Sequence, residues 1–150
     1  MRSHWILLLA AALPLPSSRA AQAPDPYAVI HVAPAKTSIY IGRLLVTPSP
    51  FVRTASGYTS NLSLELFPYF YHDDAKVYID VPEAKVMRLQ GGNAIEFKGR
   101  VVRRNGQSRK LTGRAVPTGN SAGKLSILVY LTSKVTVAFN TTYTLLAPAR

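Results

Sequence analysis

The stretch from Ile95 to Pro117 constrains the fold most, because it has the pattern of two β-strands joined by a tight turn. Apolar and polar residues alternate on both sides of Arg104-Asn105-Gly106, and an Asn-Gly pair between alternating segments is a strong indication of a β-hairpin. A two-residue turn would place apolar and charged side chains on the same face. A three-residue loop with Gly106 in the left-handed conformation keeps one face apolar, so we predict that loop and its register.

In the predicted register, one face of the hairpin is apolar, with Phe97 opposite Gly113, and the other face is cationic. Arg100 lies directly across from Lys110, and like charges opposed on a sheet destabilise it by roughly 0.2–1 kcal/mol. A bound anion would relieve this repulsion. The alternative is that the charge protects a solvent-exposed sheet edge from aggregation. The residues that we predict to bind anions are Lys98, Arg100, Arg103, Arg104, Arg109, Lys110 and Arg114.

The rest of the chain also predicts short strands separated by turns that contain proline or glycine. In addition to the hairpin, alternation indicates strands over 27–33, 38–47, 58–67, 76–81, 84–90, 124–131 and 135–146. No stretch of about ten residues shows apolar spacing of three and four, so no helix is expected after the N-terminal segment. About eight or nine strands predict a single all-β domain, either an antiparallel β-sandwich or a small β-barrel.

The first twenty residues have the pattern of a secretion signal. A short basic start precedes an apolar segment over 5–13, which is too short to span a bilayer, and small residues follow it. Cleavage after Ala23 would place Pro24 in a protease subsite that suits it badly, so we expect cleavage after Ala20. The expected organisation is a signal peptide over 1–20 and an all-β domain over 21–150, in the periplasm or outside the cell.

The chain that remains after cleavage is strongly basic, and its charge is unevenly distributed. Without Arg2 and Arg19 it has sixteen basic and seven acidic residues, a net charge of +9, and twelve of the basic residues lie from Lys85 onward beside a single acid. This imbalance favours an anionic polymer or a membrane surface as partner, with solubilising charge as the alternative. Nucleic acid is not expected, because export argues against it and no nucleic-acid-binding signature is present.

No pattern in the sequence indicates an enzyme or a bound cofactor. The chain has no cysteine, no serine in a Gly-x-Ser-x-Gly turn and no glycine-rich phosphate loop. His72-Asp73-Asp74, with Asp80 downstream, is the only cluster with metal-ligand chemistry, and it has too few oxygen donors for a hard cation. No apolar stretch after the signal approaches eighteen residues, so no transmembrane helix is expected. Nothing here predicts the oligomeric state.

Aromatic residues are concentrated over 67–78, and residues 68–74 are expected to form an aromatic approach to an acidic turn. Tyr69, Tyr71 and Tyr78 are candidates for an aromatic surface that stacks on sugars or other rings. The alternative, which the strand spacing favours, is that one side of this aromatic group, which also includes Phe67 and Phe70, packs in the core and the other side is a tyrosine rim.

Two functions fit these features. The first is a binding or structural module for anionic surfaces or polysaccharide, and the second is a carrier that encloses an apolar or amphipathic ligand in a barrel. In size, N-terminal signal and hairpin-rich C-terminal half, the chain resembles exported lipocalin-like carrier domains of bacteria. No motif of that family is present, so the resemblance implies no site residue. A small outer-membrane barrel fits less well, because prolines interrupt several short strands and the C-terminus lacks a lipid-facing aromatic residue.

Overall fold

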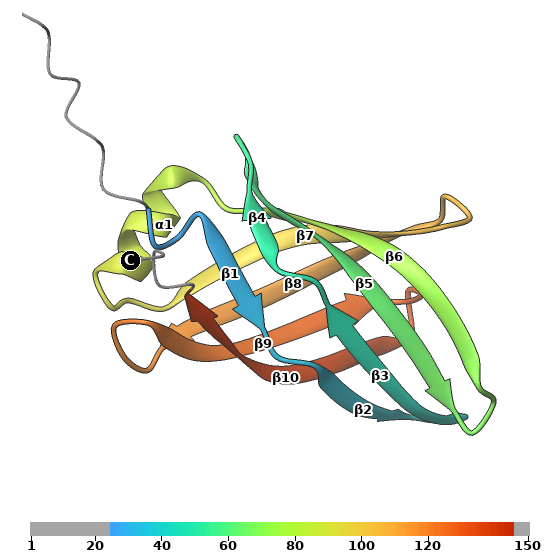
Figure 1. Ribbon diagram of the computed structural model, residues 1–150. Coiled ribbons are helices and arrows are strands. Elements are labelled where there is room, and N and C mark those ends of the chain that lie inside the picture. Colours follow the sequence, from blue (N-terminus) through green and yellow to red (C-terminus); the bar gives the residue numbers. More distant parts are fainter. Residues whose placement is uncertain (1–24, 146–150) are drawn as a thin grey trace, which may run out of the picture.

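The computed structural model describes residues 25–145, and it shows one antiparallel β-sheet that closes into a barrel (Figure 1). The all-β class predicted from the sequence is confirmed, and the expected signal peptide over 1–20 lies outside the described residues. The elements are β1 (Val29–Val32), β2 (Ala35–Ile39), β3 (Gly42–Pro48), β4 (Phe51–Arg53), β5 (Gly57–Phe67), β6 (Tyr71–Asp80), α1 (Glu83–Gln90), β7 (Ile95–Arg103), β8 (Ser108–Pro117), β9 (Ala122–Tyr130) and β10 (Thr136–Leu145).

Eight strands close the barrel, and two further strands extend its wall. The hydrogen-bonded order is β5-β4-β1-β10-β9-β8-β7-β6, and β6 pairs back with β5. Strands β2 and β3 continue the paths of β1 and β4 beyond this ring. The interruptions fall at Pro34 and Pro50, because proline has no N–H to donate to a sheet. Closure gives every strand of the ring a partner on both sides, which removes the exposed edges of an open sheet.

The basic hairpin has the predicted register. Strands β7 and β8 pair Phe97 with Gly113 and Arg100 with Lys110, and Gly106 has a φ of 86° in the three-residue loop. A Cβ at position 113 would lie 2.2 Å from the Phe97 ring, so this packing requires glycine. The hairpin also pairs with β6 and β9. It is therefore part of the closed wall, and the alternative of a charged, exposed sheet edge is wrong.

The segment expected as a strand over 84–90 is instead helix α1, so the prediction of an all-strand domain was wrong at this point. Its sequence consists mainly of good helix formers, with Glu83 in the first turn and Arg88 in the last, where their charges complement the helix dipole. Val86 and Leu89, three residues apart, bury one face of the helix. Eight residues are too few to show helical spacing over a longer window. Among the described residues, no helix has the length and apolar character needed to cross a membrane.

Two other expected elements also differ from the structure. The strand expected over 38–47 is two strands, β2 and β3, which turn at Tyr40 and Ile41. Gly42 permits this turn to pack closely, because a Cβ there would lie 2.2 Å from the carbonyl oxygen of Phe67. Residues 71–74, expected in an acidic turn, belong to β6. Strand β4 was not expected from the sequence, and together with the division into β2 and β3 it brings the number of strands to ten, although 84–90 is a helix.

The two ends of the barrel are built differently. Helix α1 lies at one end, whereas the β2–β3, β5–β6, β7–β8 and β9–β10 turns lie at the other (Figure 1). Val86 and Leu89 extend the apolar core beneath the helix, where they are 1% and 6% exposed. We call the α1 end the closed end and the end with the four turns the open end.

Candidate functional site

The barrel interior holds an apolar cavity of about 130 Å³ toward the open end. The lining side chains point inward because every second residue of a strand faces the same side of the wall. A smaller void of about 60 Å³ lies beneath α1, and Val32, Phe51 and Ile79 border both spaces. The residues that line the larger cavity include Val46, Leu62, Leu64, Val77, Leu111, Ile127, Val129 and Phe139.

The size of the cavity limits what it can hold. Small-molecule pockets usually measure about 300–1,000 Å³, and this cavity is well below that range at about 130 Å³. An apolar cavity of about 150 Å³ accommodates one benzene ring, so the space here matches an apolar group of about six carbons. An apolar lining offers water few hydrogen-bond partners, so an apolar guest has little water to displace.

Arg103 and Arg109 lie among the residues that line the cavity. Arg103 is two residues beyond Val101 on β7, and Arg109 is two residues before Leu111 on β8, so all four side chains share the inner face. Both arginines are partly buried, and each lies next to the β7–β8 turn of the open end. They place two guanidinium groups at the mouth of an otherwise apolar space.

The other basic residues predicted to bind anions do not lie at this mouth. Lys98, Arg100, Lys110 and Arg114 alternate with the inward residues of β7 and β8, and they are exposed on the outer wall. Arg104 lies in the loop at the tip of the hairpin. The structure thus divides the predicted set into an outer row, a loop residue and a pair at the cavity mouth. Anion binding by any of them stays a prediction.

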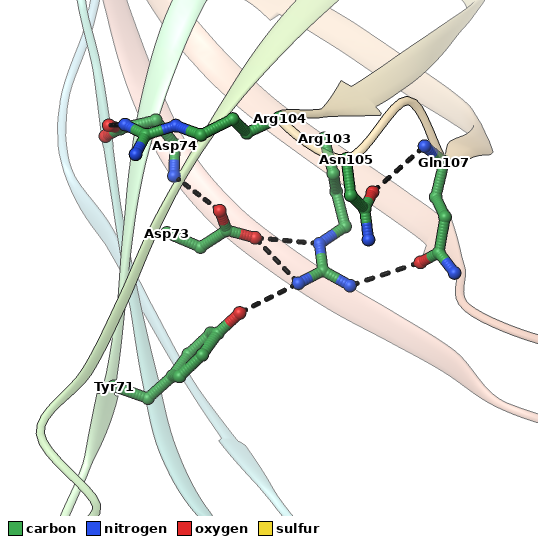
Figure 2. Close-up of polar contacts among 7 residues, drawn as sticks. All are labelled: Tyr71, Asp73, Asp74, Arg103, Arg104, Asn105 and Gln107. Atoms are coloured by element: carbon green, nitrogen blue, oxygen red, sulfur yellow. Dashed lines mark hydrogen bonds and ion pairs between the residues drawn. The ribbon is translucent and has the colours of Figure 1, made fainter.

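Arg103 is held by a network that occupies all three of its guanidinium nitrogens (Figure 2). Its Nε and Nη2 lie 2.8 and 2.7 Å from Oδ2 of Asp73. Nη2 also donates to the Tyr71 hydroxyl at 2.9 Å, and Nη1 donates to Oε1 of Gln107 at 3.2 Å. The hydrogen bond from Arg103 lowers the pKa of Asp73, and the same bond raises the pKa of the guanidinium. Asp73 therefore neutralises the charge of Arg103, and the arginine side chain links β7 to β6.

Arg109 has a different environment. Among residues 25–145, the ion pairs include no acidic partner for it. Its one hydrogen bond runs from Nη1 to the carbonyl oxygen of the neighbouring Ser108, at the long distance of 3.5 Å. A guanidinium offers a planar set of donors that matches a carboxylate or phosphate. Arg109 is thus a partly buried cation whose donors remain available at the mouth of the cavity.

A row of alternating aromatic and cationic side chains crosses the outer wall. Tyr78, Arg100 and Lys110 are neighbours in register on β6, β7 and β8, and Lys110 lies over the ring of Tyr130 on β9. The Arg100 guanidinium is 4.6 Å from the Tyr78 ring centroid, and the Lys110 ammonium is 5.8 Å from that of Tyr130. The predicted juxtaposition of Arg100 and Lys110 is confirmed. We call these four residues the outer row.

The three candidate tyrosines do not form one surface. Tyr69 and Tyr71 lie at the open end, whereas Tyr78 belongs to the outer row. Phe67 and Phe70 are 58% and 87% exposed, and Tyr69 and Tyr71 are exposed as well, so the alternative that one side of the aromatic group packs in the core is wrong.

The acidic cluster of β6 forms ion pairs within the protein. Asp73 and Asp74 pair with the neighbouring Arg103 and Arg104 (Figure 2). In the part of the chain that the structure describes, no group of three or more histidine, aspartate or glutamate residues is arranged to hold a metal ion.

Sequence reasoning missed the inward direction of Arg103 and Arg109, although a signal for it was present. From Phe97, steps of two along β7 lead through Gly99 and Val101 to Arg103, all on the predicted apolar face. The same step from Leu111 leads back to Arg109.

Comparisons with protein-family models, with curated proteins and with solved structures found no match to this chain. The candidate site is defined by the geometry of the cavity and its two arginines.

Proposed function

We propose that the protein is an exported, non-enzymatic binding protein for a small amphipathic ligand with an anionic group and an apolar part of about six carbons. The observation that carries this proposal is Arg109, a partly buried guanidinium with no acidic partner among the described residues, at the mouth of an apolar cavity. The apolar part would enter the barrel, and the anionic group would stay at the mouth.

The apolar cavity supports the first half of this arrangement. Burial of one CH₂ group contributes about 0.8 kcal/mol, so about six carbons contribute roughly 5 kcal/mol before the cost of immobilising the ligand. A gain of this size alone supports only weak binding, so a second interaction is needed for useful affinity.

Arg109 would supply that second interaction. A hydrogen bond to a charged group contributes about 1.5–3 kcal/mol, and apolar surroundings strengthen it. Arg103 is less available, because Asp73, Tyr71 and Gln107 already occupy its donors. The network around Arg103 would instead hold the mouth in shape while Arg109 contacts the ligand.

The lining also supports binding rather than catalysis. Apart from Arg103, Arg109 and Thr141, the residues around the cavity are aliphatic, aromatic or proline. The Thr141 hydroxyl donates to the carbonyl oxygen of Ala33 at 2.8 Å. Export rests on the predicted signal over 1–20.

The proposal is tested by titrating the protein with hexanoate and with hexanol while following the methyl resonances of the cavity-lining valines and leucines by NMR. Both ligands are expected to shift resonances of residues such as Leu111 and Val129, with hexanoate binding more tightly. Arg109→Gln should weaken hexanoate binding about tenfold or more and leave hexanol binding nearly unchanged.

Two further variants make the test specific. Arg114→Gln removes a cation from the outer wall and is the matched control, with no expected effect on either ligand. Val129→Phe fills the cavity and should abolish both titrations. Equal losses in the two arginine variants, or an unaltered titration after Val129→Phe, would contradict the proposal.

The outer row supports a second candidate function, which is binding of an anionic polysaccharide. Arg100 and Lys110 are directly opposed on the sheet, and each lies beside a tyrosine ring. A sulfate or carboxylate between the two cations would relieve their repulsion, and a sugar face can stack on the adjacent tyrosine.

Retention on immobilised heparin tests this second function. Arg100→Ser combined with Lys110→Ser should lower the salt concentration of elution and flatten the dependence of binding on salt. Arg43→Ser combined with Lys36→Ser removes the same charge from β2 and β3 and serves as the control. Equal effects of the two double variants would indicate that net charge alone governs retention.

A further inference from the structure

Exposed apolar side chains are concentrated at the open end. The described residues include thirteen large hydrophobic side chains that are exposed, and nine of them lie on the turns and strand ends at this end of the barrel. The polar turns of the closed end, such as 54–56 and 118–121, contribute none. One of the nine, Tyr130, belongs to the outer row. We call the other eight the open rim: Tyr40, Ile41, Phe67, Tyr69, Phe70, Tyr71, Leu131 and Val135.

The most exposed members of the open rim lie on two neighbouring turns. Pairing of β3 with β5 sets Arg43 opposite Phe67, and this places the β2–β3 turn beside the β5–β6 turn (Figure 1). Tyr40 is 106% exposed and Phe70 is 87% exposed. The ring centroids of Phe67 and Phe70 are 5.8 Å apart in an edge-to-face arrangement, so the two side chains contact one another while remaining in solvent.

The backbone at Phe70 helps to keep the ring exposed. Its φ of 50° lies in the left-handed region, which is rare for a bulky residue and is concentrated at functional sites. A turn that served only to connect β5 and β6 would have no need of an aromatic residue in this conformation. The strain and the exposure together indicate that the ring has a partner outside the chain.

The charges around the open rim are mainly positive. Lys36, Arg43 and Lys134 lie on β2, on β3 and in the β9–β10 turn, and within the described residues they form no ion pair. The two aspartates at the start of β6 are already paired with arginines. Glu65 is the one acidic residue of β5, and His72 lies opposite it.

We propose that the open rim docks on a lipid membrane surface. Tyrosine is favoured at the level of the lipid headgroups, where its ring meets acyl chains and its hydroxyl meets water, and phenylalanine enters the apolar side of the same interface. The three cations without ion pairs complement anionic headgroups. The rim consists of separate projecting turns rather than a groove, so it suits a deformable planar surface better than a peptide or a rigid protein.

Docking in this orientation would bring the mouth of the cavity to the bilayer. Arg109 and the apolar lining lie at the same end as the open rim. An amphipathic ligand partitions into bilayers, so it could pass between membrane and cavity without crossing bulk water. This last step rests on the proposed function, whereas membrane docking does not.

The absence of cysteine from the chain allows a clean test by single-site labelling. An environment-sensitive fluorophore is attached to Ser38→Cys, beside Tyr40, or to Ser121→Cys in the β8–β9 turn of the closed end. Vesicles of phosphatidylcholine with a minor share of phosphatidylglycerol are then added to the full chain. The label at position 38 should shift to the blue and be quenched by a quencher in the acyl region, whereas the label at position 121 should not respond.

A second measurement identifies the side chains responsible. Combining Tyr40→Ser with Phe70→Ser should reduce the response of the label at position 38 about tenfold or more, because two rings no longer enter the interface. Met87→Ser, which removes an exposed apolar side chain from α1, is the control and should leave the response unchanged.

Several outcomes would overturn the proposal. These are equal responses from both labels, a response only at position 121, or no response at position 38. Complete loss of the response in high salt would also overturn it, because it would indicate adsorption through charge without insertion of the rim. Concentration-dependent self-association that disappears in the Tyr40→Ser and Phe70→Ser double variant would identify the rim as a contact between copies instead. Hexanoate titration without vesicles tests the ligand proposal separately.

Discussion

The two ends of this barrel share the same strands but differ in how far their apolar side chains are buried and in which of their polar groups have partners. At the closed end, α1 buries Val86 and Leu89, and the Tyr58 hydroxyl donates to the carbonyl oxygen of Tyr27 at 2.8 Å. At the open end, the core gives way to an apolar cavity, the apolar side chains of the turns are exposed, and Arg109 has no acidic partner among the described residues.

Ion pairs occur at both ends of the barrel. At the closed end, Arg53 pairs with Asp25 and with Glu83, and so links β4 to the start of the described chain and to α1. At the open end, Arg103 pairs with Asp73 at the edge of the cavity, and Arg104 pairs with Asp74. The difference between the ends therefore lies in burial: the packed core beneath α1 indicates that the closed end contributes most of the stability, and the open end can keep exposed apolar groups for a ligand or a surface.

The strongest test of the difference between the two ends is to shorten one apolar side chain at each end and compare the loss of stability. Leu89→Ala, beneath α1, should lower the free energy of unfolding by about 3 kcal/mol, because the buried side chain leaves a cavity. Leu131→Ala, at the open rim and 36% exposed, should cost about 1 kcal/mol, because part of the side chain is already in solvent. Urea unfolding measures both values. Similar losses of unfolding free energy from the two substitutions would contradict the proposed difference between the ends.

Removal of the buried Tyr58 hydroxyl is expected to have the next largest effect on the free energy of unfolding. Tyr58→Phe should cost about 1–2 kcal/mol at neutral pH, because the carbonyl oxygen of Tyr27 loses its buried donor. Tyr71→Phe removes a hydroxyl from the open end, where water can replace it, and should cost about 0.5 kcal/mol. Equal costs would show that the two hydroxyls are equally desolvated.

The raised pKa of Tyr58 predicts a loss of stability at alkaline pH. Burial raises the pKa of Tyr58 to about 12 from the ordinary value of 10.0, so the folded state favours the neutral phenol. The stabilisation is complete below pH 10.0 and is lost as the pH rises through about 12. Tyr58→Phe should reduce this loss in urea unfolding across that range. A residual loss is expected, since burial also raises the pKa of Tyr143 to about 12.

The ion pair at the cavity mouth predicts a smaller effect in acid. Asp73→Asn should cost about 1 kcal/mol at neutral pH, because Arg103 loses its carboxylate partner in a partly exposed setting. The pKa of Asp73 is lowered in the folded protein, so this contribution is present above the ordinary value of 3.8 and is lost as the pH falls through the folded value.

Asp80→Asn on the outer wall is the control for that measurement. Asp80 has no ion pair among the described residues, and its substitution should change stability by less than about 0.5 kcal/mol. Urea unfolding at neutral and acidic pH compares the two variants. If Asp73→Asn and its parent lost stability equally on acidification, the ion pair would not contribute.

Substitution of Arg109 is expected to have the smallest effect on stability, and the effect should be stabilising, unlike those of the substitutions above. Arg109→Leu should raise the free energy of unfolding by about 0.5 kcal/mol, because a partly buried cation without an acidic partner is replaced by an apolar group. Thermal unfolding compares it with Arg114→Leu, which lies exposed on the outer wall and should not be stabilising. A destabilising Arg109→Leu would mean that the arginine is held for structure rather than for a ligand.

Short-range sequence signals were sufficient for the hairpin and for most strands. Asn105-Gly106 and the alternation around it determine the loop and the register, because pairing in a hairpin depends on a few neighbouring residues. Strands β5, β9 and β10 follow from alternation for the same reason. The helix signals at Glu83, Arg88 and the buried pair of α1 were also present, but they extend over only eight residues.

The candidate site depended on contacts between distant parts of the chain. Closure joins β1 to β10, pairing Ile30 with Leu145 across almost the whole described chain, and no local pattern specifies that partner. Only this closure turns the inner faces of separate strands into one cavity. Pairing of β6 with β7 brings Arg103 to Asp73, whereas Arg109 on β8 meets no acid within the described residues. The seven cations of the hairpin could be read from the sequence, but their separate environments depend on which strands the barrel brings beside them.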